Sequence, residues 1–142
     1  MGNELIAIYG ELSEIYIIQS NTCEQYCTLL SRLYPDWVTC ATAIPVDDSV
    51  SVLLGVTAGG TLKVWRISSI IKDSVIFEEE SKQIRECSHP IKVQIKLNFL
   101  VILTRKSLLV IDSSDFMTVG LYENRNRVTY PNGSYKSVII TK

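Results

Sequence analysis

Apolar and polar residues alternate along most of this chain in short runs, the pattern of β-strands with two unlike faces. The clearest run is Val50–Thr57, which two glycines separate from a second run, Thr61–Arg66. Gly59 and Gly60 stand where the chain must reverse, and a two-residue hairpin needs the positive φ that Gly adopts at little steric cost. The pattern therefore predicts a two-residue β-hairpin here, with Trp65 in its second strand.

Two further runs are similar to the second strand of this hairpin. They are Glu14–Gln19 and Ser107–Asp112, and the three runs begin 47 and 46 residues apart. A period of about 40–50 residues, built from four short strands, is that of a propeller blade. The sequence therefore predicts an all-β fold, in the form of a β-propeller arc.

The other strands of each blade are expected between these runs. Their ranges are Leu5–Tyr9, Tyr26–Leu30, Trp37–Ile44, Val75–Glu79, Ile91–Leu97, Phe99–Thr104 and Phe116–Leu121. Val75–Glu79 is expected to close the blade that contains the hairpin. The runs Ile15–Ile18, Phe99–Leu103 and Leu108–Ile111 are apolar on both faces, as a strand requires when its sheet lies between two others.

The period divides the chain into two complete blades and two partial ones. Residues 1–33 form a partial blade without its opening strand, residues 34–88 and 89–124 form complete blades, and residues 125–142 begin the next. Propellers typically close with four to eight blades, so the chain is expected to be an arc of a longer protein. Such an arc alone leaves blade faces and strand edges uncovered, which predicts poor solubility or oligomerisation.

Composition and charge narrow the class of protein. Hydrophobic residues make up 46% of the 142 residues and charged residues 20%, as in a folded soluble protein. No apolar run approaches the roughly 20 residues of a membrane span, and the start lacks a secretory signal, so we expect a cytoplasmic location without membrane insertion. The net charge of −1 argues against a nucleic-acid surface.

Charge is unevenly divided along the chain. Residues 1–60 hold one basic and seven acidic residues, a balance of −6, and residues 61–142 have a balance of +5. Two interpretations stay open. The protein has two solvent-exposed faces of different charge, or it is an arc whose ends bind oppositely charged partners.

The four cysteines do not have the paired spacing of a zinc site. They are Cys23, Cys27, Cys40 and Cys87, and we expect them reduced, with no metal and no cofactor bound. Cys87 and His89 are close enough in sequence to form a thiol–imidazole pair, which needs hydrogen-bond contact and a third orienting group. A hydrolase that uses Cys40 or Cys87 with His89 is the weakest of three functional hypotheses.

Two aromatic positions and one acidic run are candidates for structure or interaction. Trp65 is expected in the core. Trp37, which follows Asp36 at a connection between blades, is expected as a wedge between them, and an exposed interface residue is the alternative. The acidic run Glu78, Glu79 and Glu80 predicts a solvated outer edge that discourages aggregation, or alternatively a docking strip for a basic partner.

A second candidate interaction surface is cationic. Arg125 and Arg127 lie near Tyr122 and Tyr130, a mixture enriched at protein interfaces, although a plain surface loop also fits. A phosphoinositide-binding propeller at membranes, the second functional hypothesis, would use a paired-Arg loop of this kind.

Several segments resemble WD-repeat proteins. Leu62–Trp65 resembles the closing strand of a WD-repeat blade, although Arg66 stands where an acidic residue commonly follows the Trp. The next unit keeps the acid as Asp112 and lacks the Trp. The repeat positions carried by this resemblance are Asp36, Trp37, Gly59, Gly60, Trp65 and Asp112.

The order of three segments is more specific. Pro35–Val38, Thr57–Trp65 and Ile76–Lys82 follow one another as in the beta branch of the rabconnectin family, large WD-repeat proteins of animals. That resemblance implies a non-catalytic scaffold that pairs with the rabconnectin alpha subunit and promotes assembly of the V-type ATPase. It also implies acidification of endosomes and synaptic-type vesicles, with peripheral association at their membranes, and it brings no catalytic or cofactor residues.

Overall fold

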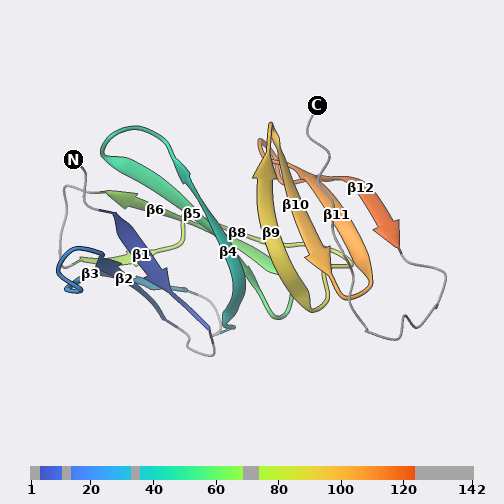
Figure 1. Cartoon of the computed structure of the whole chain (residues 1–142). Helices are drawn as coiled ribbons and strands as arrows, with labels where there is room; N and C mark the ends of the chain where they lie inside the picture. The colour runs from blue at the N-terminus through green and yellow to red at the C-terminus, as the bar shows by residue number, and fades with distance from the viewer. Residues whose placement is uncertain (1–3, 11–13, 33–35, 69–73, 124–142) are drawn as a thin grey trace.

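All regular structure that the computed structural model describes is β-strand (Figure 1). The described residues are 4–10, 14–32, 36–68 and 74–123. The strands are β1 (Leu5–Ile8), β2 (Ile15–Gln19), β3 (Gln25–Leu30), β4 (Val38–Pro45), β5 (Val50–Thr57), β6 (Thr61–Ser68), β7 (Ser74–Phe77), β8 (Glu80–Gln83), β9 (Pro90–Lys96), β10 (Phe99–Thr104), β11 (Ser107–Asp112) and β12 (Thr118–Glu123). The predicted all-β fold is confirmed. Residues 125–142, expected to begin the next blade, lie outside the described residues, and so do Arg125 and Arg127.

The strands form three four-stranded sheets that lie one after another in space (Figure 1). The first sheet has the order β1-β2-β3-β7, the middle sheet β4-β5-β6-β8, and the third sheet β9-β10-β11-β12. Every pair of neighbouring strands is antiparallel except β3 and β7, which are parallel.

The middle sheet is buried on both faces. Successive residues of a strand point to opposite faces, so Leu53 and Leu54 of β5 enter two different apolar clusters. Leu53 packs with residues of the first sheet, including Ile17, whereas Leu54 packs with residues of the third sheet, including Ile102. The two clusters fix the three sheets as successive layers.

One strand assignment made from the sequence is wrong. Residues 74–77, expected to close the blade that contains the hairpin, form β7 and hydrogen-bond with β3 of the first sheet, with Leu29 opposite Ile76. The outer strand of the middle sheet is instead β8, which pairs with β6. The chain passes from the first sheet to the middle sheet through Glu78 and Glu79 alone.

The hairpin between β5 and β6 turns through three residues, one more than expected. Gly60 N donates to Thr57 O at 3.0 Å, and Gly60 has a φ of +87°. A three-residue hairpin is commonly a type I turn followed by one left-handed residue, and here that residue is Gly60. Gly59 does not have a positive φ, so only the second glycine meets the conformational requirement inferred from the sequence.

The two tryptophans have opposite environments. Trp65 is 2% exposed, and its Nε1 donates to Leu30 O at 3.0 Å, which connects the middle sheet to the first sheet. Trp37 is 45% exposed, so its expected role as a wedge between blades is wrong. Val38, the next residue, is buried in the cluster that contains Trp65, and alternation along the chain therefore directs Trp37 outward.

Candidate interaction surfaces

The hairpin loop is a structural junction. Asp36 Oδ2 accepts a hydrogen bond from Gly59 N at 3.0 Å, and Gly60 O accepts one from Ile84 N at 3.0 Å. A Cβ on Gly60 would lie 2.1 Å from Cys87 O, so the backbone of residues 84–87 packs directly against this glycine. Asp36, Gly59 and Gly60 therefore hold neighbouring segments together.

Asp112 orders the turn that follows β11. Its Oδ1 accepts hydrogen bonds from Ser114 Oγ at 2.6 Å and from Ser114 N at 2.8 Å. These two bonds to the ionised carboxylate lower the pKa of Asp112. An aspartate that bonds to the backbone two residues later is a common turn device. The position has a local structural function in this chain.

The acidic run divides into one buried and two exposed residues. Glu78 is 6% exposed, and its carboxylate accepts hydrogen bonds from Arg32 N at 2.9 and 3.1 Å. Glu79 forms an exposed ion pair with Arg66 at 3.3 Å, and Glu80 is exposed in β8. The prediction of a solvated edge is therefore wrong for Glu78, which bridges from the crossing segment to the end of the first sheet.

Lys63 is a buried charged residue that the sequence analysis missed. It is almost fully buried in β6, and its Nζ donates a hydrogen bond to Ser31 Oγ. The only signal in the sequence was a Lys between Leu62 and Val64, two apolar residues of a strand that also contains Trp65 and Ile67. A buried ammonium needs polar partners, and the residues after β3 supply one.

The structure places Cys40 and Cys87 in the core and His89 at the surface. Cys40 and Cys87 are buried, and burial raises the pKa of each thiol to about 11, so both are protonated at neutral pH. His89 is exposed, and its Nδ1 lies 2.8 Å from Ser88 Oγ. Burial of Cys27 likewise raises its pKa to about 11, while Cys23 is exposed. Burial of Cys40 and Cys87 therefore disfavours the thiolate that the hydrolase hypothesis requires.

The described ranges contain no group of three or more His, Cys, Asp or Glu side chains placed to hold a metal ion. Among the same residues, no helix is long and apolar enough to cross a membrane.

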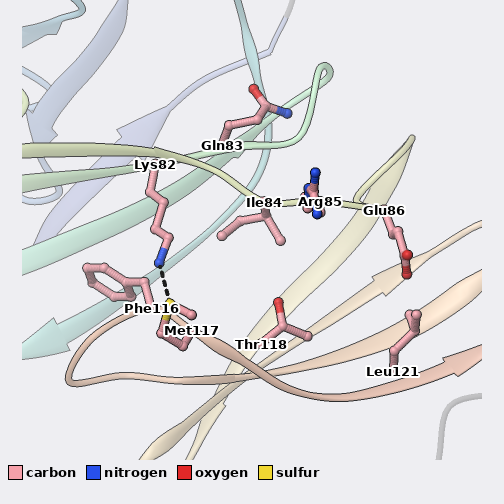
Figure 2. A pocket seen from close by; sticks show the side chains of 9 residues that line it. All are labelled: Lys82, Gln83, Ile84, Arg85, Glu86, Phe116, Met117, Thr118 and Leu121. Carbon is pink, nitrogen blue, oxygen red and sulfur yellow. Dashed lines mark hydrogen bonds between the residues drawn. The ribbon is translucent and has the colours of Figure 1, made fainter.

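Two hollows lie at the boundaries between sheets. One, of about 410 Å³, lies between β1 and β2 of the first sheet and the β4–β5 hairpin of the middle sheet. The other, of about 420 Å³, lies between the outer segment of the middle sheet and the outer segment of the third sheet (Figure 2). The residues lining the second hollow are Lys82, Gln83, Ile84, Arg85, Glu86, Phe116, Met117, Thr118 and Leu121.

The fold is similar to solved structures of propellers. The chain superposes on AztD from Citrobacter koseri with a TM-score of 0.59 and 11% identity, covering 87% of this chain and 33% of that one. It superposes on BamB from Moraxella catarrhalis with a TM-score of 0.51 and 10% identity, covering 87% and 38%. Both are β-propeller proteins. The chain is a partial propeller arc.

Sequence comparison finds similarity to WD-repeat proteins. No family model matches the chain. It is 27% identical over 136 residues to WD repeat-containing protein 72 of Pongo abelii, and 28% identical over 140 residues to the Homo sapiens protein of the same name. Each match covers 87% of this chain and 12% of the relative, so the arc spans about an eighth of their length. This similarity supports a WD-repeat protein, and WD-repeat propellers are generally non-enzymatic interaction scaffolds.

Proposed function

We propose that this propeller arc is a non-catalytic scaffold of the rabconnectin complex, which promotes V-type ATPase assembly and the acidification of endosomes and vesicles. Its partners would be the rabconnectin alpha subunit and V-type ATPase subunits. Its location would be cytoplasmic, with peripheral association at endosomal or synaptic-type vesicle membranes. This specific role rests on the resemblance of Ile76–Lys82 and the segments that precede it, and the general scaffold role rests on the similarity to WD-repeat proteins.

One structural observation supports the scaffold role above the others. The segment that carries the most specific resemblance is the crossing between two sheets, where β7 ends in the first sheet and β8 begins in the middle sheet. Glu78 is held inside by Arg32 N, so Glu79 and Glu80 are presented outward from a fixed backbone. Loops and edges held by packed sheets are where binding residues concentrate.

The experiment is an affinity capture from animal-cell extract with the 142-residue chain as bait. Recovery of the rabconnectin alpha subunit or of V-type ATPase subunits is the expected result. A matched variant, Glu79→Lys with Glu80→Lys, changes only exposed side chains and tests whether the acidic strip meets a basic partner. Capture of neither partner by the unmodified chain would contradict the rabconnectin role.

Membrane association needs a separate measurement. Flotation with liposomes that contain phosphoinositides distinguishes direct lipid binding from recruitment by protein partners. We expect no lipid-dependent flotation of the chain alone. Flotation that depends on phosphoinositide would favour the membrane-propeller hypothesis instead.

A further inference from the structure

The outer edges of the middle and third sheets differ in their protection. An exposed edge strand is a template for pairing with another chain, and charged residues normally discourage it. The edge strand β8 carries Glu80 and Lys82 among its four residues. The edge strand β12 carries exposed Val119, Leu121 and Tyr122, and its only charged residue is the last, Glu123. In the part of the chain that the structure describes, no strand pairs with the outer side of β12.

The second of the two hollows forms a groove beside this edge (Figure 2). The segments 82–86 and 116–121 contribute its lining, and its volume is about 420 Å³. Ile84 is buried and Phe116 is half-buried, while Met117 and Leu121 are exposed apolar residues at the same hollow. The groove can therefore take an apolar side chain from a segment that lies along β12.

The lining segments are fixed to each other. Lys82 Nζ donates to Asp115 O at 3.3 Å and contacts Met117 Sδ at 3.2 Å, so one side chain spans the two segments (Figure 2). Phe116 N donates to Asp112 O at 2.8 Å, which holds the turn before β12. A ligand would meet a preformed groove, and preformed sites reduce the entropic cost of binding.

The charge on the groove indicates the polarity of the ligand. Arg85 is exposed at the groove and has no ion-pair partner within the described ranges. Glu86 stands next to it, so an acidic group on a ligand is attracted at Arg85 and repelled one residue further on. Lys82, the other cation of the lining, already bonds to Asp115 O and Met117 Sδ, so Arg85 is the position that favours an acidic side chain on a bound segment.

We propose that β12 and this groove bind an extended, acidic–apolar peptide segment of a partner protein. The segment adds a strand to the outer edge of β12, inserts an apolar side chain beside Ile84 and Leu121, and pairs a carboxylate with Arg85. Strand addition of this kind takes its affinity from main-chain hydrogen bonds and its specificity from alternate side chains. The inference rests on the proposed scaffold role and names the surface through which that role is exercised.

The test uses a defined peptide in place of a cellular partner. A fluorescein-labelled peptide of sequence Thr-Val-Thr-Leu-Asp-Val-Thr is titrated with the 142-residue chain, and fluorescence anisotropy is measured. We expect saturable binding. Arg85→Glu should weaken it about fivefold, the upper range for an exposed ion pair. The matched control Arg105→Glu changes an exposed cation at the turn between β10 and β11, outside the groove, and should leave affinity unchanged.

Two N-methylated peptides test the strand addition itself. They carry the methyl groups on alternate amides, so one of the two loses the N–H groups that would face β12. That peptide should bind about tenfold more weakly than the other. Absence of saturable binding, equal affinity for Arg85→Glu and Arg105→Glu, or equal affinity for the two methylated peptides would overturn the proposal. Because no alpha subunit or ATPase is present, this result is independent of the affinity capture.

Discussion

At the scale of single residues, Gly60 has the least freedom to change. Its φ is +87°, and an added Cβ would lie 2.1 Å from Cys87 O, a backbone atom that cannot move without its segment. Gly60→Ala should lower the free energy of unfolding by about 2–4 kcal/mol. Gly59→Ala is the matched control, because its Cβ would meet only the movable Asp36 carboxylate, at 2.9 Å. Denaturant unfolding measures both, and equal losses would contradict the argument.

The buried thiols predict a dependence of stability on alkaline pH. Burial raises the pKa of Cys40 and of Cys87 from about 9 to about 11, so the unfolded chain ionises before the folded one. Their contribution is fully present below about pH 9 and is lost as pH rises toward about 11. The urea concentration at the midpoint of unfolding should therefore decrease as the pH rises from about 9 to about 11. Cys87→Ala should make this decrease smaller. Cys23→Ser is the matched control, because it changes an exposed thiol.

At the scale of elements, the pairing of β7 with β3 separates two possible blade assignments. Ile76→Pro removes an N–H from β7 and should increase hydrogen exchange in β3, where Leu29 lies opposite Ile76. The control Ser81→Pro, in β8, should instead loosen β6 around Lys63. Increased hydrogen exchange in β6 after Ile76→Pro would instead indicate that residues 74–77 pair with β6 in the middle sheet.

The sequence predicted the strands with regular alternation well and the connections between sheets poorly. Ile91–Leu97 alternates strictly, and β9 lies within one residue of that range. Residues 74–77 form a short strand whose partner is set by tertiary packing, and nothing in four residues specifies a parallel neighbour more than 40 positions away. Burial of Glu78 follows from that same pairing, so the sequence could not predict it either.

The groove beside β12 could not have been predicted for a similar reason. Its two lining segments lie about 30 positions apart, and each contains a residue other than Gly with positive φ: Glu86 at +64° and Phe116 at +57°. Such residues give no turn signal in the sequence. Trp37 was misplaced because its direction depends on the exact residue at which β4 begins.

At the scale of the whole molecule, the arc ends in an apolar face on the first sheet. Ile8, Tyr16, Thr28 and Val75 are aligned across its four strands and share the face turned away from the middle sheet. Ile8 and Val75 are exposed there, as are Ile6 and Phe77. We expect the chain to self-associate with rising concentration, because an uncovered apolar sheet face favours association.

Sedimentation velocity over a range of concentrations measures this association. Val75→Glu places a charge on the exposed face and should reduce it. Leu97→Glu is the matched control, since Leu97 is 87% exposed in the turn between β9 and β10. A chain that stays monomeric and unfolds in a single sharp transition would contradict the expectation.

Because β7 pairs with β3, the first sheet is completed late during synthesis of the chain. The ribosome releases β3, which ends at Leu30, well before β7, which begins at Ser74. At about 5–20 residues per second, the missing neighbour of β3 follows after about 2–9 s, and the whole β5–β6 hairpin emerges in between. The first sheet is therefore the earliest to be translated, yet it cannot be completed until most of the middle sheet has left the ribosome.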